Sequence, residues 1–260
     1  MFLSGSNIPD QKLFTTHILI VDKINTDLSN IDTVILVGGL GTRLQPILKD
    51  KPKCLAPING KPFIDILLDR CIDQGLKRFI LCVGYLKEQV IEHLSDRKDC
   101  EIVFSLEEEL LGTGGALKNA ERHIRTDHFI VLNGDTFLEV NYNELIEWHC
   151  KKNADITIAI NYFQNVGRYG SVTFDSNSKI IGFFEKGINP GYGWINAGVY
   201  VMVKSILKEI ELNINSSLEF DLFPDCIGKS IYGYKNEGNM IDIGTLVSYD
   251  EAQLKLRKVL

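Results

Sequence analysis

The sequence predicts an α/β protein, a Rossmann-like three-layer sandwich with a mixed, mainly parallel central sheet. Three observations lead to this prediction. Short apolar runs of strand length alternate with amphipathic runs of helix length, which is typical of βαβ units. Glycines follow the first regular strand, and an Asn-Gly-Asp turn follows a later one. Because the carboxyl ends of parallel strands share one edge of a sheet, both turns are expected where ligands bind.

The first half of the regular sequence alternates strands with helices. Apolar runs favour strands at 33–37, 78–83, 101–104 and 129–132. Apolar residues at every third or fourth position favour helices at 62–74, 87–94 and 115–124, because that spacing puts them on one helical face. The strand exits at 38–43, 84 and 133–135 are therefore expected to lie together.

After Asp155 the pattern changes to shorter strand-like runs. We expect strands at 156–160, 170–174, 180–184 and 195–202, then two helical stretches, a strand near 240–243 and a closing amphipathic helix over 245–257. This change divides one domain, 33–260, into halves at 33–153 and 154–260. Residues 1–32 form an N-terminal extension of unknown role, in which 18–21 is one candidate strand.

The composition is that of an ordinary globular protein. The 260 residues are 45% hydrophobic and 24% charged, with a formal net charge of −6. This balance disfavours a nucleic-acid partner, which normally requires a basic footprint, so local cations have to meet any anionic substrate. No apolar run approaches membrane-spanning length, and no signal-peptide pattern occurs at the start. The six cysteines show no CxxC or zinc spacing, so we expect reduced thiols in a cytoplasmic protein with no membrane partner.

The glycine turn at 38–43 has the features of a phosphate cradle. Backbone N–H groups in such a turn approach a phosphate closely, and Arg43 and Lys53 add cations beside it. A Walker A loop is excluded because no Gly-x4-Gly-Lys-Ser/Thr run occurs. A dinucleotide fingerprint is disfavoured because Leu44 stands where its third glycine belongs. An ordinary tight turn with a solvated arginine remains the alternative for this pattern alone.

Two aspartates end apolar strands farther along the chain. Asp135 follows 130–134, and Asp242 ends a run near the C-terminus. Carboxylates at such positions suit a hard divalent cation that also contacts substrate phosphates. A turn or helix-cap aspartate is the alternative for each. Together with Arg43 and Lys53, however, they favour a site for phosphoryl transfer.

Three further segments have side chains suited to a polar ligand. The small residues at 111–116 allow a ring or sugar to lie against backbone amides, although a flexible loop is the alternative. The polar sets at 168–170 and 185–186 are otherwise surface groups. The segment 194–198 combines an aromatic residue, an amide and small residues, and a bent core strand is its alternative.

Taken in order, these segments resemble the sugar-1-phosphate nucleotidyltransferases. The resemblance covers roughly Thr33 to the C-terminus and rests on seven motifs in the order of that family. Within it, 132–137, 168–170 and the short chain are most similar to the D-glycero-D-manno-heptose 1-phosphate guanylyltransferases. Cys54 is a departure, because relatives often carry proline after the lysine. The implied fold is the nucleotide-diphospho-sugar transferase type.

The resemblance implies a role for each matching residue. Arg43 and Lys53 would be catalytic and neutralise charge on the α-phosphoryl group and the leaving pyrophosphate, and Asp135 and Asp242 would bind Mg²⁺. The nucleotide-binding residues would be Leu36, Gly38, Gly39, Gly41, Thr42, Gly112 and Thr113. The sugar-phosphate-binding residues would be Asn133, Gly170, Glu185, Lys186 and Asn196. The first half of the domain would bind the nucleotide and the second half the sugar phosphate.

The implied reaction joins a nucleoside triphosphate, expected to be GTP, to a sugar 1-phosphate, expected to be D-glycero-D-manno-heptose 1-phosphate. It would yield an NDP-sugar and pyrophosphate for lipopolysaccharide or capsule synthesis, and it is compatible with a homodimer. One alternative keeps the fold: a mannose-1-phosphate guanylyltransferase or a hexose-1-phosphate thymidylyl- or uridylyltransferase. Another is a regulatory protein that binds nucleotide sugars without turnover. An NAD-dependent dehydrogenase is disfavoured by Leu44 and by the missing ribose-binding acid.

Overall fold

A nine-stranded mixed sheet forms the centre of the computed structural model, which describes residues 27–258 except 165, 169 and 185–190. Its strands run in the order β10-β9-β11-β6-β1-β4-β5, with β8 paired to β11 and β12 paired to β8. Four neighbouring strands are parallel: β5 (Glu101–Leu106), β4 (Arg78–Val83), β1 (Asp32–Leu36) and β6 (His128–Asn133). The Rossmann-like fold with a mixed central sheet is therefore confirmed.

The second half of the chain extends the same sheet. β11 (Gly193–Val203) pairs antiparallel with β6, and β12 (Ile231–Asn236) pairs parallel with β8 (Ile156–Phe163). β9 (Ser171–Phe174) and β10 (Ile180–Phe184) form the other edge. Two small sheets pair β2 (Pro57–Ile58) with β3 (Lys61–Pro62) and β7 (Thr136–Leu138) with β13 (Met240–Asp242).

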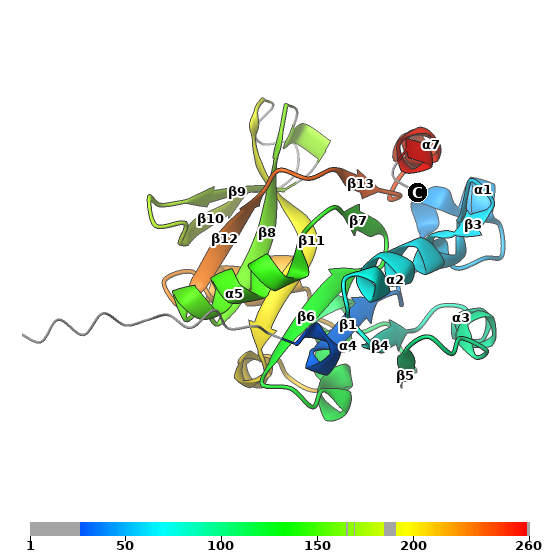
Figure 1. Ribbon diagram of the computed structural model, residues 1–260, viewed down its shortest axis with the longest axis horizontal. Coiled ribbons are helices and arrows are strands. Elements are labelled where there is room, and N and C mark those ends of the chain that lie inside the picture. The colour runs from blue at the N-terminus through cyan, green and yellow to red at the C-terminus, as the bar shows by residue number, and fades with distance from the viewer. Residues whose placement is uncertain (1–26, 165, 169, 185–190, 259–260) are drawn as a thin grey trace, which may run out of the picture.

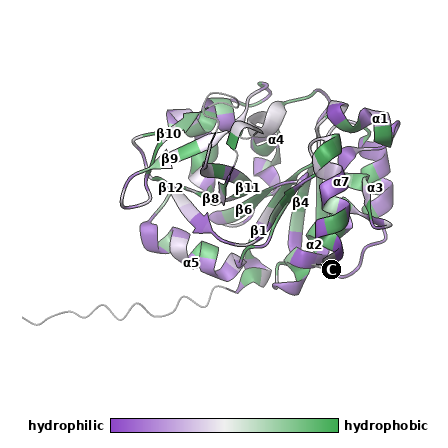
Figure 2. Cartoon of the chain, turned by 90° about the horizontal axis from the view of Figure 1, so that it is seen from above, coloured by the Kyte–Doolittle hydropathy of each residue, from purple (hydrophilic) through white to green (hydrophobic). Residues whose placement is uncertain are grey.

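Helices cover both faces of the sheet, which gives the three layers (Figures 1 and 2). One face packs on α2 (Phe63–Asp73), α3 (Lys87–Leu94) and α5 (Tyr142–Lys152). The other packs on α4 (Gly112–Ala120) and α6 (Phe223–Asp225). Successive side chains of a strand point to opposite faces, so Ile35 enters the first core and Val34 the second.

A third apolar cluster lies beside the carboxyl edge of the sheet. It joins α1 (Gln45–Leu48), β7, β13 and α7 (Leu246–Lys255), which gather at one end of the molecule (Figure 1). Its fully buried members include Leu44, Phe137 and Ile243. This cluster fixes the chain on either side of Asp242 relative to the end of β6.

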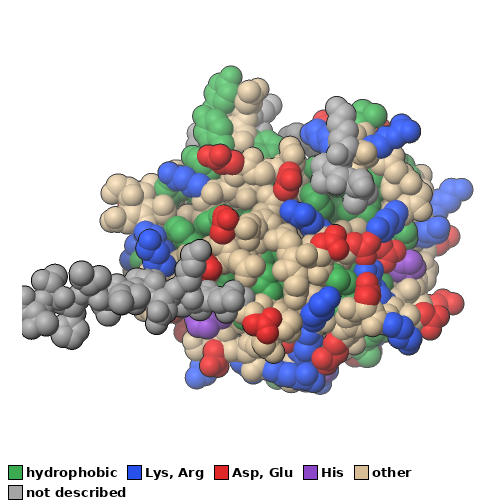
Figure 3. Space-filling view, in the orientation of Figure 1, with side chains coloured by type: hydrophobic (Ala, Val, Ile, Leu, Met, Phe, Trp, Pro, Cys, Tyr) green, Lys and Arg blue, Asp and Glu red, His purple; other side chains and the backbone are tan. Residues whose placement is uncertain are grey.

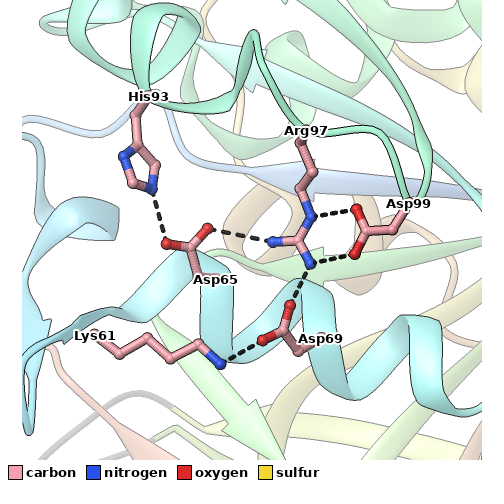
Figure 4. Close-up of polar contacts among 6 residues, drawn as sticks. All are labelled: Lys61, Asp65, Asp69, His93, Arg97 and Asp99. Atoms are coloured by element: carbon pink, nitrogen blue, oxygen red, sulfur yellow. Dashed lines mark hydrogen bonds and ion pairs between the residues drawn. The ribbon is translucent and has the colours of Figure 1, made fainter.

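An ionic cluster joins α2, the end of α3 and the connection between α3 and β5 (Figure 4). Arg97 donates to Asp99 from Nε at 2.8 Å and to Asp65 from Nη1 at 3.3 Å, and it also pairs with Asp69. His93 Nε2 lies 2.8 Å from Asp65, and Lys61 pairs with Asp69. Elsewhere on the face drawn in Figure 3, basic side chains are interspersed with acidic ones.

The expected elements agree closely with the observed ones. The exception in position is the helix expected at 115–124, which begins at Gly112 as α4 and ends in a 3-10 turn, Glu121–His123. Six further helices and strands of the described structure, α1, β2, β3, β7, α5 and β12, were not expected. α5 has polar residues on most of its surface, and β12 carries Gly233 and Lys235, so neither forms a clear apolar run. The candidate strand at 18–21 lies outside the described residues.

The sequence predicts reduced cysteines and no apolar run of membrane-spanning length. All six cysteines are free thiols, and four of them are buried. Within the described part of the chain, no helix is both long and apolar enough to cross a membrane.

Candidate active site

The predicted strand exits meet at one edge of the sheet. Gly134 N–H, after β6, donates to Leu36 C=O at the end of β1 at 2.9 Å. Tyr85 N–H, after β4, donates to Gly38 C=O at 3.2 Å. The glycine turn therefore lies between the ends of β4 and β6, as the strand pattern predicted.

The glycine turn presents unused backbone donors. Among the described residues, no group accepts a hydrogen bond from the N–H of Gly39, Leu40 or Gly41. Gly41 has φ 61°, a left-handed conformation that glycine adopts without steric cost, and it starts the 3-10 turn Thr42–Leu44. Free N–H groups in such a turn form a cradle for an anion. Arg43 is exposed on that turn, where it is available to a bound phosphate.

Lys53 connects this turn to the two strand-terminal acids. A Cβ added to Gly41 would lie 3.1 Å from Lys53 Cβ, so the turn packs against the lysine. Lys53 Nζ donates to Asp135 Oδ2 at 2.5 Å. Burial acts to raise the pKa of Asp135, but the charge and hydrogen bond of Lys53 outweigh it and hold that pKa below its usual range.

Asp242 lies beside this pair because β13 pairs with β7. Ile243 N–H donates to Asp135 C=O at 2.9 Å. Asp242 Oδ1 accepts from Gly244 N–H at 2.7 Å and from Ser248 Oγ at 3.1 Å, at the start of α7. A Cβ added to Gly244 would lie 2.8 Å from Asp242 Oδ1 and 3.6 Å from Lys53 Nζ. The structure thus brings Lys53, Asp135 and Asp242 together.

The donor chemistry at this point fits Mg²⁺. Two carboxylates offer the hard oxygen ligands that Mg²⁺ prefers, and the Asp135 side chain is 39% exposed. No group of three or more acidic, histidine or cysteine side chains forms a metal site among the described residues. Mg²⁺ commonly binds through one or two carboxylates plus substrate phosphates. Asp135 and Asp242 match that pattern.

The predicted nucleotide loop at Gly112 and Thr113 packs against the second half of the chain. Gly114 N–H, in the first turn of α4, donates to Ser216 C=O at 2.8 Å. Thr113 Oγ1 accepts from Leu218 N–H at 2.8 Å and donates to Glu219 Oε2 at 2.9 Å. Thr113 therefore contacts residues more than a hundred positions later in the chain.

The predicted sugar-phosphate residues are placed in part. Asn133 ends β6, and a Cβ added to Gly198 of β11 would lie 3.0 Å from its Nδ2. Asn196 donates from Nδ2 to Tyr200 Oη at 2.9 Å. Gly170 precedes β9 and lies close to the backbone of Phe184, because a Cβ added to Gly170 would lie 3.2 Å from Phe184 C=O. Glu185 and Lys186 lie outside the described residues.

Sequence reasoning missed Glu107, which lies behind the glycine turn. Its side chain is 5% exposed, and Oε2 accepts from Leu111 N–H at 3.1 Å. Oε1 has no hydrogen-bond partner in the described structure, and it would lie 2.5 Å from a Cβ added to Gly38. Burial raises the pKa of Glu107, and the Leu111 hydrogen bond only partly opposes this. Its position directly after β5 could have indicated a site residue. However, it is the first of three consecutive glutamates, and the sequence pattern does not distinguish it from the other two.

Tyr200 and Glu219 were also missed. Tyr200 is fully buried, and its Oη lies 3.4 Å from Glu219 Oε1. Glu219 follows Ser217, whose Oγ donates to Glu219 Oε2 at 2.9 Å. Neither residue ends a parallel strand or belongs to a glycine motif, so the sequence pattern does not distinguish them.

The site is suited to positioning and neutralising phosphates. It combines an N–H cradle, two cationic side chains and two carboxylates at one sheet edge. Burial raises the pKa of the neighbouring Cys54 thiol to about 12, so this cysteine is not a nucleophile near neutral pH. The arrangement favours phosphoryl transfer between bound substrates.

Comparison with known proteins gives consistent matches. The family described as Nucleotidyl transferase matches residues 32–259. The D-glycero-alpha-D-manno-heptose 1-phosphate guanylyltransferase of Aneurinibacillus thermoaerophilus is 36% identical, over 87% of this chain and 99% of its own. The crystal structure of HddC from Yersinia pseudotuberculosis complexed with GMP-PN has a TM-score of 0.78 at 36% identity, and covers 87% of this chain and 99% of that one. The mannose-1-phosphate guanylyltransferase of Mycobacterium tuberculosis is 32% identical to this chain. The match covers 83% of this chain and 61% of the length of that relative.

Proposed function

Because the chain belongs to the nucleotidyl transferase family, we propose that it transfers a guanylyl group from GTP to D-glycero-D-manno-heptose 1-phosphate. The family match covers almost all of the described structure. A heptose 1-phosphate guanylyltransferase that is aligned over 99% of its length supports the choice of sugar. A structural neighbour complexed with GMP-PN supports a guanine nucleotide.

The reaction is an in-line displacement at the α-phosphorus. An oxygen of the sugar 1-phosphate forms a bond to the α-phosphorus. The bond between the α-phosphorus and the oxygen that bridges it to the β-phosphate breaks, and pyrophosphate leaves. The nucleophile is already anionic near neutral pH, so no general base is required. Arg43 and Lys53 neutralise the charge that develops on the α-phosphoryl group and on the departing pyrophosphate. Asp135 and Asp242 would hold Mg²⁺, which would supply further neutralisation of phosphate charge when bound.

Within the structure itself, the observation that supports guanine is the unpaired oxygen of Glu107. A carboxylate accepts hydrogen bonds on both oxygens. The Watson–Crick edge of guanine offers two adjacent donors, N1–H and the 2-amino group, whereas uracil and thymine offer one. Oε1 lies at the turn 38–41 and Oε2 at Leu111, so this carboxylate lies between the two predicted nucleotide loops. A buried acceptor without a donor is costly, and guanine relieves that cost.

The test of this assignment is the substitution Glu107→Gln. Glutamine offers one acceptor and one donor, which suits the N3–H and O4 of uracil or thymine better than guanine. We expect kcat/KM for GTP to fall roughly a hundredfold, because about 3 kcal/mol of charge-assisted hydrogen bonding is lost. The preference for GTP over UTP and dTTP is expected to fall with it, as measured by pyrophosphate release. Glu108→Gln, at the exposed next residue, is the matched control, and an unchanged GTP preference in E107Q contradicts the assignment.

Mannose 1-phosphate is the second candidate acceptor. It is favoured by the mannose-1-phosphate guanylyltransferase that matches most of this chain. The two candidates differ in sugar alone and share the guanine site, so they are distinguished by kcat/KM for the two sugar 1-phosphates at fixed GTP. A protein that only binds nucleotide sugars is the alternative of another class. It predicts GTP binding without pyrophosphate release.

A further inference from the structure

Glu219 joins the two predicted halves of the site through its two carboxylate oxygens. Oε2 accepts from Thr113 Oγ1 and from Ser217 Oγ, each at 2.9 Å. Oε1 faces Tyr200 Oη at 3.4 Å. One side chain therefore contacts the predicted nucleotide loop at α4 and the predicted sugar-binding strand, β11.

The contact with β11 continues to the sugar side. Burial, and then the charge of Glu219, raise the pKa of Tyr200 well above its usual range, so the phenol stays protonated and donates to Glu219. Because that proton is used, Tyr200 Oη is left as an acceptor for Asn196 Nδ2 at 2.9 Å. Asn196 Oδ1 in turn accepts from Gly198 N–H at 2.9 Å. The amide of Asn196 is thereby held in one orientation.

We propose that Glu219 is a positioning residue that orients Asn196 toward the sugar phosphate while it anchors Thr113 on the nucleotide side. This role rests on the proposed function, because it assigns one substrate to each end of the network. Both carboxylate oxygens act as acceptors. An amide has only one acceptor oxygen, so glutamine at this position serves one end of the network and not the other.

The substitution Glu219→Gln separates the two ends with almost no change in volume. Thr113 and Ser217 present two donors and Tyr200 one, so we expect the amide oxygen to stay with the first pair. The amide nitrogen then faces the donor of Tyr200, and Asn196 loses its fixed orientation. The dissociation constant of the sugar 1-phosphate, measured by calorimetry with GTP analogue bound, is expected to rise about tenfold, the effect of one hydrogen bond to a charged group. The dissociation constant of GTP is expected to stay within about twofold.

Two further variants keep the proposal testable. Tyr200→Phe removes the link on the sugar side alone and is expected to weaken sugar 1-phosphate binding to a similar extent. Because both changes break one chain of hydrogen bonds, the double variant is expected to show no additional loss. Asp221→Asn is the matched control, since Asp221 is exposed and the one hydrogen bond of its side chain in the described structure is accepted from Ser217 N–H, at 2.7 Å.

Unchanged sugar 1-phosphate binding in E219Q, or an additive double variant, overturns the proposal. An equal loss of affinity for both substrates also overturns it, because it indicates a general structural role. The binding measurement does not depend on turnover. If the wild-type protein releases no pyrophosphate while E219Q still weakens sugar binding selectively, the proposed reaction fails and the positioning role stands.

Discussion

Lys53 is the side chain on which the predicted catalytic residues converge. It packs under the glycine turn, pairs with Asp135 and lies near Asp242. Arg43, by contrast, is exposed on the 3-10 turn above it. The two predicted catalytic cations thus differ in exposure, Lys53 being half-buried and Arg43 exposed.

Removing either cation is expected to slow the reaction with little effect on folding. Arg43→Ala and Lys53→Ala should each lower kcat roughly a hundredfold, because one preorganised charge contributes about 3 kcal/mol to the transition state. Lys51→Ala, at an exposed lysine of the same loop, should keep wild-type kcat. Pyrophosphate release measures the effect. Near wild-type turnover in R43A or K53A contradicts the catalytic assignment.

The fully buried His149 gives a prediction about stability and pH. Its Nδ1 lies 2.8 Å from Thr157 Oγ1 and its Nε2 lies 3.1 Å from His128 Nδ1. Burial, and then the charge of His128, lower the pKa of His149 to about 3. In the unfolded chain, this histidine binds a proton with a pKa near 6.5. Between pH 6.5 and 3 the unfolded state therefore binds a proton that the folded state does not. The free energy of unfolding is unaffected above about pH 6.5 and decreases as the pH falls from there toward 3.

The contribution of His149 should approach about 1.4 kcal/mol per pH unit between those values. Urea unfolding from pH 7 to pH 4.5 measures it. His149→Gln should be less stable at pH 7, because buried contacts change, but its stability should fall less steeply with acid. Identical slopes for the two proteins contradict the account of this histidine.

At the scale of elements, the Arg97 cluster joins α2 to α3 and to the connection that leads from α3 to β5 (Figure 4). Arg97 is 13% exposed, and its removal leaves Asp65, Asp69 and Asp99 close together without their shared partner. Arg97→Ala is expected to cost about 2 kcal/mol, or roughly 6 °C in Tm, without lowering kcat. Lys98→Ala, at the exposed neighbour, is the control. An unchanged Tm in R97A shows that the cluster adds nothing to stability.

The elements differ in how far the sequence predicts them. β1, β4 and β6 each contain an unbroken apolar run because helices cover both faces of the sheet. Their glycine and aspartate exits were predicted to meet. α5 and β12 were missed because half-exposed elements carry polar residues within their periodic pattern. Glu107 and Glu219 were missed for another reason. Their proposed roles depend on contacts with Gly38, Thr113 and Tyr200 that local sequence patterns do not encode.

At the scale of the whole molecule, the predicted halves share one sheet. β6 of the first half pairs with β11 of the second across five residues, and the end of β6 carries Asn133 and leads to Asp135. The assignment of 33–153 to the nucleotide and 154–260 to the sugar phosphate stays a prediction, in which one sheet edge would hold both substrates. The role of residues 1–26 lies outside the described structure.

The most direct measurement is a substrate screen for pyrophosphate release. GTP, ATP, UTP and dTTP are each combined with D-glycero-D-manno-heptose 1-phosphate, mannose 1-phosphate and glucose 1-phosphate in the presence of Mg²⁺, with an EDTA arm and product mass as controls. We expect the highest kcat/KM for GTP with the heptose 1-phosphate, a GDP-heptose product and loss of turnover in EDTA. No release with any pair, or a clear preference for another nucleotide, contradicts the assignment of this chain as a heptose 1-phosphate guanylyltransferase.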